Sequence, residues 1–90
     1  MEIEYDPAKR EKTLQERGLD FHDASLLFSG RTATSPDTRK NYGEDRFITA
    51  GFIRDRLVVM VWTPRGKAKR IISMRHAHDT EERIWRQQMD

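Results

Sequence analysis

The pattern of hydrophobic and polar positions changes its period near residue 30. In residues 20–30, Phe21, Ala24, Leu27 and Phe28 recur at the spacing of one helix face. In residues 46–53, 57–63 and 68–76, the apolar side chains instead form short β-branched runs bounded by turn residues, which are typical of strands. The sequence therefore predicts helices in the first third of the chain and strands in the middle.

Residues 6–18 carry the end signals of a helix. Asp6 is a preferred N-cap, Pro7 suits the first helical position, and Gly18 suits the residue just past the end. Inside this segment only Ala8 and Leu14 are clearly apolar. A helix that is polar nearly all round either packs lightly or faces a partner. Asp20 is expected to be the N-cap of the second helix.

The strand segments predict one antiparallel sheet. We expect strands at 31–35, 46–53, 57–63 and 68–76, because short connections between consecutive strands require antiparallel pairing. Residues 1–5 alternate as in a short edge strand or form a tethered terminus. Residues 57–63 are apolar throughout, which predicts a central strand covered on both faces.

A last helix is predicted from Asp79, with Asp79 as its cap and Glu82 completing a capping box. Helices at both ends of the chain are then expected to cover one face of the sheet. The predicted fold class is α+β, with two N-terminal helices and a C-terminal helix on an antiparallel sheet of about four to five strands. Residues 1–90 are expected to form a single domain.

Composition narrows the class of protein. Charged residues make up 36% of the chain, against about 25% in typical domains, and there is no cysteine for a disulfide or a thiolate. No apolar stretch approaches the roughly 20 residues of a membrane span, and the acidic N-terminus lacks the apolar segment of a signal peptide. We therefore expect a cytoplasmic protein that does not contact a membrane.

The net charge of +2 hides an uneven distribution. Residues 31–76 carry eleven basic and four acidic side chains, whereas the segments on either side are acidic overall. A segment this basic suits a polyanion or an acidic protein partner. A well-solvated surface with scattered ion pairs explains the charge equally well.

The last predicted strand ends in Arg75 and His76. In an extended strand Arg70, Ile72, Met74 and His76 share one row, and Ile71, Ser73 and Arg75 share the other. If Ile72 and Met74 face the helices, Arg75 lies on the open face. We expect Arg46 and Arg75 to converge there beside Arg65 and Lys67, which would form a basic concave surface.

Each candidate also has a structural explanation. Arg75 can pair with Glu81 or Glu82, and a histidine at a strand end is more often structural than catalytic. His76 and His78 have the spacing of a metal pair, but no third ligand lies near them in the sequence, so no metal site is expected. Trp85 can belong to the core or stack on a base.

Three stretches give a more specific signal when they are taken in order. They are YDPAKREKTLQERGLDFHDASLLF, then GEDRFITAGF, then RIISMRHA followed by an acidic pair and an aromatic residue. This ordered set resembles the BrnT-type toxins over essentially the whole chain. The resemblance has departures: His78 stands where threonine is usual, and Trp85 stands where tyrosine is expected.

The resemblance implies a RelE-like fold and a ribonuclease toxin that inhibits translation in a type II toxin–antitoxin module. It also implies a BrnA-type antitoxin with a ribbon-helix-helix domain, a 2:2 heterotetramer, and contact with operator DNA only through the antitoxin. The competing interpretations are a non-catalytic nucleic-acid-binding module and a protein-interaction adaptor.

RNA cleavage requires activation of a 2′-hydroxyl, stabilisation of the phosphorane charge and protonation of the leaving oxygen, and arginine, histidine and glutamate can do this without a metal or another cofactor. We therefore predict a metal-independent endoribonuclease. In the predicted catalytic set, phosphate is held by Arg46, Arg70 and Arg75, and a proton is transferred by His76 or Glu44. The predicted RNA contacts are Arg65, Lys67 and Trp85. The predicted antitoxin contacts are Lys9 and Lys12.

Overall fold

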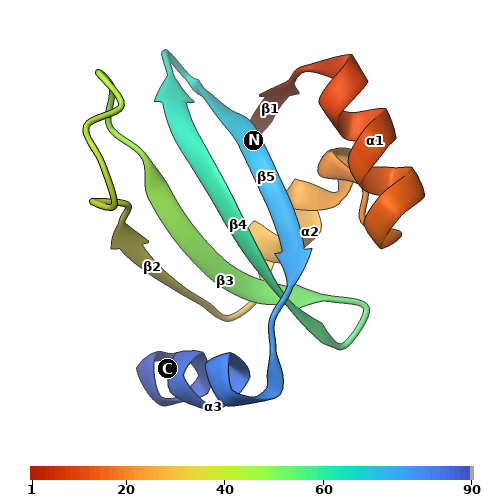
Figure 1. Cartoon of the computed structure of the whole chain (residues 1–90), viewed down its shortest axis with the longest axis vertical. Coiled ribbons are helices and arrows are strands. Elements are labelled where there is room, and N and C mark those ends of the chain that lie inside the picture. Colours follow the sequence, from red (N-terminus) through yellow and green to blue (C-terminus); the bar gives the residue numbers. More distant parts are fainter. Residues whose placement is uncertain (90) are drawn as a thin grey trace.

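The computed structural model describes residues 1–89 and contains three α-helices and one five-stranded sheet (Figure 1). The strands are β1 (Glu2–Tyr5), β2 (Thr32–Pro36), β3 (Phe47–Ile53), β4 (Arg56–Arg65) and β5 (Ala68–His76). The helices are α1 (Pro7–Arg17), α2 (Ala24–Ser29) and α3 (Asp79–Gln88), with a short 3-10 turn, η1 (Phe21–Asp23), before α2. The α+β class predicted from the sequence is confirmed.

The sheet has the strand order β1-β5-β4-β3-β2. Strands β2 to β5 pair with their neighbours antiparallel, as predicted. The N-terminal strand β1 pairs with β5 in parallel, so the sheet is mixed and not antiparallel throughout. The long connection between β1 and β5 permits this parallel pair, since only a short turn would impose an antiparallel one.

The end signals of α1 are confirmed. The Asp6 carboxylate accepts a hydrogen bond from the Ala8 backbone N–H at 2.9 Å, and Gly18 has a left-handed φ of 68°. None of the residues of α1 is buried. The helix is fastened instead by polar contacts: Arg10 donates two hydrogen bonds to Asp20, and Arg17 donates one to the Met74 carbonyl at 2.6 Å.

The second helical segment is shorter than expected. Asp20 caps it by accepting from the His22 N–H at 2.9 Å, as predicted, but its first residues form the 3-10 turn η1 before α2 begins. Phe21, Ala24 and Leu27 are buried, so the apolar face read from the sequence is the one that packs on the sheet.

The apolar side chains of β4 build two cores. Val58, Met60 and Trp62 join Leu27 of α2 in the larger core, whereas Leu57 joins a smaller core with other residues. The smaller core contains Ala33, Ala50, Leu57 and Met89, with Trp85 packed against it. The prediction that β4 is central and covered on both faces is confirmed.

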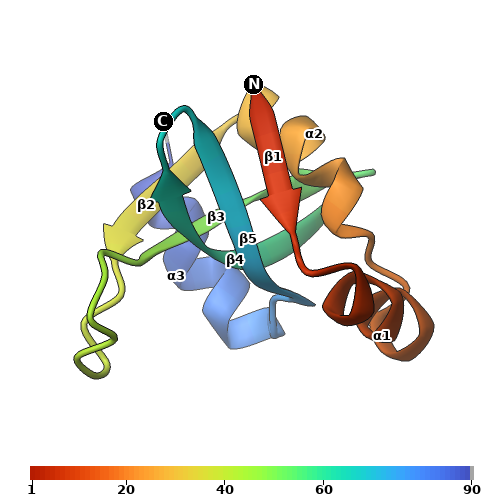
Figure 2. The ribbon, with the colours of Figure 1, turned by 90° about the horizontal axis from the view of Figure 1, so that it is seen from above.

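The expectation that all the helices cover one face is wrong. Trp85 of α3 and Met89, which follows it, pack on the face opposite α1 and α2 (Figure 2). The physical reason is the continuous apolar run of β4, which leaves hydrophobic side chains on both faces and requires cover on each. We call the two sides of the sheet the α2 face and the α3 face.

A β-bulge in β5 changes which of its side chains share a face of the sheet. Trp62 pairs with Ile71 and Val61 pairs with Ser73, so Ile72 is an extra residue. An extra residue shifts every later side chain relative to the simple alternation. Consequently Ile71 and Met74 are buried in the same core, and the prediction that Ile72 shares the helix-facing row with Met74 is wrong.

Helix α3 begins one cap position earlier than expected. His78 is the N-cap, and Glu81 accepts a hydrogen bond from the His78 backbone N–H at 3.2 Å. The predicted box of Asp79 with Glu82 is therefore displaced by one residue. At the other tight connection, the β3–β4 hairpin turns through Arg54 and Asp55, both with positive φ, and uses no glycine.

Candidate nucleic-acid interface

A small cavity opens on the α3 face, between the strands and α3. Its volume is about 120 Å³. The floor comes from β3, β4 and β5, one wall comes from α3, and the other wall comes from the loop between β2 and β3. The lining residues are Arg39, Ile48, Val59, Val61, Ser73, Arg75, Glu81 and Trp85.

Arg75 and Glu81 form the best-defined polar contact in this cavity. The guanidinium donates from Nη1 to Oε1 at 2.6 Å and from Nη2 to Oε2 at 2.7 Å. This bidentate contact lowers the pKa of Glu81 and raises the pKa of Arg75, mainly through the shared hydrogen bonds. As predicted, Arg75 lies on the face opposite α1 and α2, and the alternative contact, its pair with Glu81, is the one observed.

Arg39 also lines the cavity, and it was not predicted from the sequence. Its guanidinium binds the Asp37 carboxylate through two hydrogen bonds of 2.7 Å, and its charge acts on Arg75. The Asp37 side chain is fully buried, and its pKa is lowered to about 2 mainly by the Arg39 hydrogen bonds. A clue in the sequence was the Asp-x-Arg spacing in a loop directly after a strand.

The loop that carries Arg39 is closed at its base. The Asp37 backbone N–H donates to the Arg46 carbonyl at 2.8 Å, and the Thr63 hydroxyl donates to the Asp45 carbonyl at 2.5 Å. Near the loop tip, Asn41 accepts a hydrogen bond from the Gly43 N–H at 2.9 Å. These contacts tie the loop to the sheet and hold Arg39 at the cavity.

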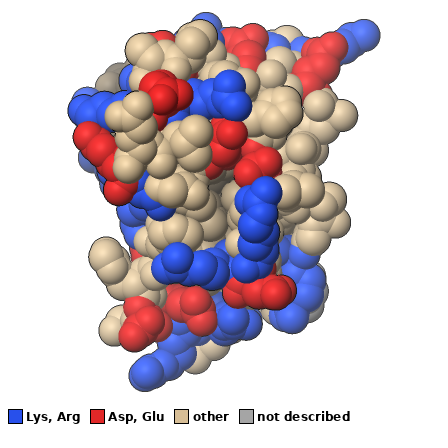
Figure 3. Space-filling model, turned by 90° about the vertical axis from the view of Figure 1, so that its right-hand side faces the viewer, with Lys and Arg blue, Asp and Glu red and all other residues tan. Residues whose placement is uncertain are grey.

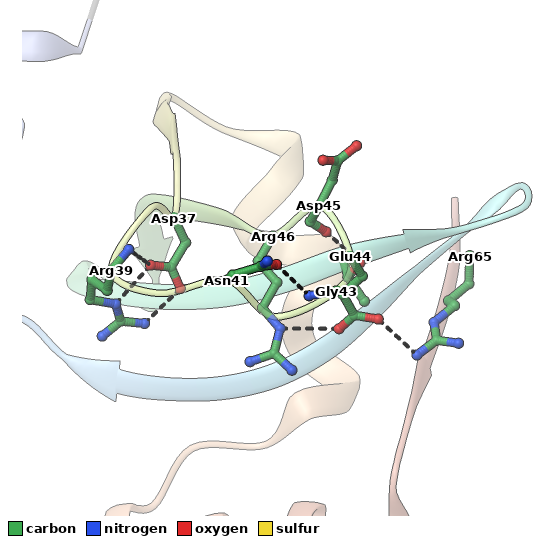
Figure 4. A network of polar contacts seen from close by, with 9 residues as sticks. Asp37, Arg39, Asn41, Gly43, Glu44, Asp45, Arg46 and Arg65 are labelled. Atoms are coloured by element: carbon green, nitrogen blue, oxygen red, sulfur yellow. Dashed lines mark hydrogen bonds and ion pairs between the residues drawn. The ribbon is translucent and has the colours of Figure 1, made fainter.

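A second group of charged side chains lies at the far end of the sheet. Glu44 accepts from Arg46 at 3.0 Å and from Arg65 at 3.3 Å (Figure 4). Arg46 also stacks on the Tyr42 ring at 3.9 Å. Arg70 lies next to this group in the sheet register, opposite Thr63, and pairs with Glu4 at 3.1 Å.

Arg46 and Arg75 do not converge, so that expectation is wrong. Arg46 precedes Phe47, which pairs with Trp62 of β4. Arg75 pairs with Val59, which lies three residues before Trp62 along the same strand. The antiparallel register therefore separates the two arginines along the sheet. The loop residue Arg39, and not Arg46, accompanies Arg75 in the cavity.

His76 lies on the α2 face, away from the cavity. It pairs with Val58 of the larger core and lines a different pocket, with Arg17 and Arg56. Burial and then the positive charge of Arg56 lower the pKa of His76, while a weaker contact with the Arg17 backbone opposes them. Arg75 and His76 are adjacent in sequence but point to opposite sides of the sheet.

The comparison with protein families matches this chain over residues 5–81. The matching family is described as "Ribonuclease toxin, BrnT, of type II toxin-antitoxin system". The chain belongs to the BrnT family. No curated protein matches it. The resemblance drawn from the three ordered stretches is thus confirmed, and membership implies a protein antitoxin as partner.

The BrnT match includes Arg39, Arg75 and Glu81 but ends before Trp85. Trp85 is partly buried, packs against the smaller core and also lines the cavity. Trp85 therefore packs against the core, which is one of its two predicted roles, and it also borders the cavity.

The other candidate residues lie on exposed surface. Lys67 is in the turn between β4 and β5, and Lys9 and Lys12 are on α1. Within residues 1–89, no three His, Asp or Glu side chains are grouped so that they could hold a metal ion. None of the helices described here is long and apolar enough to cross a membrane.

Proposed function

We propose that this BrnT chain cleaves RNA at the cavity on the α3 face, without a metal, and thereby inhibits translation in the cytoplasm. Family membership supplies the class, a ribonuclease toxin. The observation that carries the location is the grouping of Arg39, Arg75, Glu81 and Trp85 around one cavity. Two cations, a carboxylate and an aromatic ring are the side chains needed to hold a phosphate, move a proton and stack a base.

The first step of the proposed mechanism is an exchange of partners. Arg75 presents a planar fork, which binds phosphate oxygens as well as carboxylate oxygens. A phosphate entering between Arg39 and Arg75 takes over the hydrogen bonds that Glu81 now accepts. Once Glu81 is released from Arg75, the largest of the interactions that lower its pKa is lost, and its carboxylate becomes a stronger base.

The second step is the attack of the 2′-hydroxyl on the phosphate. Glu81 takes the hydroxyl proton, the bond from the 2′-oxygen to phosphorus forms, and the bond to the 5′-oxygen breaks. The 5′-oxygen leaves as an alcohol by taking a proton from a water molecule, and the hydroxide that remains takes the proton held by Glu81. The other product is a 2′,3′-cyclic phosphate. Arg39 and Arg75 stabilise the extra charge of the phosphorane, a contribution of about a hundredfold or more in rate for one donor.

The remaining predicted residues have supporting roles in this proposal. Arg46, Arg65, Arg70 and Lys67 hold phosphates along the rest of the α3 face, and Glu44 orients Arg46 and Arg65. Trp85 stacks a base at the scissile position. His76 is not assigned to proton transfer at this cavity, because it lies on the other face of the sheet.

The partner in this proposal is an antitoxin of the BrnA type, with a ribbon-helix-helix domain that binds operator DNA. The toxin is taken as one RelE-like domain, and two copies of each protein form the complex. The interface is proposed to include Lys9 and Lys12, because α1 buries no residue of its own and exposes them.

A second candidate function is RNA binding without cleavage. It is favoured by one observation: the pairing with Arg75 keeps the Glu81 carboxylate ionised and occupied, which makes it a poor base in the unbound protein. The two functions differ in products. A binding module gives salt-sensitive RNA affinity and no cleaved RNA, whereas a nuclease gives both.

Expression of the chain alone tests the proposed function in cells. Growth and translation should stop, and co-expression of the neighbouring antitoxin should restore them. Normal growth at a high level of soluble protein would contradict the proposal.

A further inference from the structure

A second cationic pocket lies on the α2 face, at the end of the sheet where β5 stops. It has a volume of about 230 Å³, several times the roughly 30 Å³ share of one water molecule. Its walls come from the end of α1, the β3–β4 hairpin and the last residue of β5. The lining residues are Arg17, Gly18, Leu19, Ile53, Arg54, Arg56 and His76, and none of them is acidic.

Two of the three arginines of this pocket are held in place by side-chain contacts with other described residues, and the third is not. Arg17 donates to the Met74 carbonyl at 2.6 Å, which fixes its side chain across the end of β5. Arg54 pairs with Asp23 at 3.0 Å. Arg56 forms no ion pair with any described residue, so its charge is available to a ligand. Figure 3 shows several basic side chains, with acidic ones among them, in the lower half of the side of the molecule that carries α1.

The hairpin at this pocket uses an unfavourable backbone. Arg54 and Asp55 have φ values of 49° and 66°, a region that glycine or asparagine occupies at lower cost. A residue with a side chain costs about 1 kcal/mol or more there. The exposed pair of Arg54 with Asp23 offsets little of this cost.

One ring nitrogen of His76, Nδ1, is buried and has no hydrogen-bond partner among the described residues. Buried polar atoms are nearly always satisfied, so an unsatisfied one next to a cationic pocket is notable. A bound anion would supply negative charge beside Arg56 and His76, and none of the residues that line the pocket is acidic.

We propose that this pocket binds a phosphate group of the RNA at a position outside the scissile site. The inference rests on the proposed function for its choice of RNA. Arg75 and His76 are consecutive but face opposite sides, so a strand that leaves the cavity at Arg75 and crosses the end of β5 reaches the pocket directly. Guanidinium forks suit the phosphate oxygens of such a strand.

The first test uses inorganic phosphate on the intact chain. Phosphate should shift the NMR signals of the His76 ring saturably at constant ionic strength, where chloride should not. Arg56→Gln should weaken this phosphate affinity about fivefold or more, a change typical of losing one charge-assisted contact. Lys12→Gln, which removes the same charge from an exposed site on α1, should leave it unchanged. A signal that does not saturate, or equal affinity in Arg56→Gln, would overturn the site.

The second test uses a 2′-O-methyl RNA oligonucleotide, which cannot be cleaved. Arg56→Gln should weaken its binding and reduce the slope of log affinity against log salt by about 0.7, the value for one phosphate contact on a single strand. The rate of RNA cleavage at saturating substrate should stay unchanged. If Arg56→Gln weakens phosphate binding but does not change oligonucleotide binding, the RNA assignment is overturned. It is also overturned if the NMR signals of His76 shift when the antitoxin is added and do not shift when the oligonucleotide is added.

The two proposals fail separately. If the wild-type chain cleaves no RNA but Arg56 still governs oligonucleotide binding, the ribonuclease proposal fails and the phosphate pocket stands. If cleavage occurs and Arg56→Gln behaves as Lys12→Gln does in both binding tests, the pocket fails and the ribonuclease proposal stands.

Discussion

Arg75 and Glu81 lock the end of β5 to the start of α3 through two parallel hydrogen bonds of 2.6 and 2.7 Å. The same pair lines the cavity on the α3 face. A guanidinium that binds a carboxylate in this way is already arranged to bind a phosphate. The pair therefore contributes both to the packing of α3 and to the proposed chemistry. Variants of the two residues can be tested for each contribution separately, by thermal unfolding and by RNA cleavage.

Glu81→Gln should reduce RNA cleavage and retain RNA binding. The amide keeps the size of the side chain but cannot take a proton, and it frees Arg75 from a competing charge. We expect cleavage to fall by a factor on the order of 10² or more, as for loss of a general base, with RNA affinity equal or higher. Single-turnover cleavage and fluorescence anisotropy measure the two quantities.

Glu82→Gln is the matched control for this test. Glu82 lies on the same helix and pairs with Arg86 at 3.1 Å on an exposed surface. Its variant should cleave RNA at the wild-type rate. Equal losses in the two variants would show that the charge of α3 matters and that Glu81 has no specific role.

Charge reversal at Lys9 and Lys12 should weaken the antitoxin complex. Helix α1 buries no residue in the toxin, so its exposed side chains are free to contact a partner. If both lysines are in the interface, Lys9→Glu with Lys12→Glu should cost more than about 1 kcal/mol, or roughly fivefold in affinity. Titration calorimetry measures this, with Lys67→Glu as a charge-matched control outside α1. Unchanged affinity would leave α1 as a solvated helix face.

The stability of the fold should fall as the pH drops from about 7 to about 5.5, partly because of His76. Its pKa is lowered in the folded state by burial and by Arg56, so the unfolded chain binds a proton more readily. The stabilisation is present above the unfolded pKa of about 6.5 and is lost as the pH falls below it. Denaturant unfolding of His76→Asn should show a weaker pH dependence than wild type, whereas His22→Asn should not. The same dependence in all three proteins would contradict this role for His76.

Gly51→Ala should destabilise the packing of α2 on the sheet. A Cβ atom at this position would lie 2.8 Å from two carbon atoms of the Leu27 side chain and 3.2 Å from the Leu27 carbonyl oxygen. Overpacking of this kind costs about 1–3 kcal/mol. Gly30→Ala is the control, because nothing lies within 4 Å of its added Cβ. Thermal unfolding should separate the two, and similar melting temperatures would show that α2 moves to accommodate the methyl group.

Local signals in the sequence predicted the parts of the fold that depend on neighbouring residues. Asp6, Asp20 and Gly18 lie at the helix ends where capping rules put them, because a cap is satisfied within a few residues of itself. The apolar run of β4 likewise predicted a central strand, because a strand that is buried on both faces is apolar at consecutive positions and does not alternate with polar residues.

Features that depend on distant contacts were not predictable in the same way. Nothing in RIISM marks Ile72 as a bulge, because the bulge is defined by its pairing with β4. The side on which α3 packs depends on which face of β4 remains uncovered. Arg39 was missed because its position depends on the Asp37 carboxylate and on the closure of a loop, and Arg46 was misplaced because strand register was unknown.

The most direct test of the proposed ribonuclease site is RNA cleavage by the purified chain in excess EDTA, measured beside thermal unfolding for wild type and Arg75→Ala. The proposal predicts cleavage by the wild type and a loss of about a hundredfold or more in Arg75→Ala. Because the pair with Glu81 is partly exposed and worth at most about 1 kcal/mol, the melting temperature should fall by no more than about 4–8 °C. Intact RNA with the wild type, or a large drop in melting temperature with full activity per folded molecule, would contradict it.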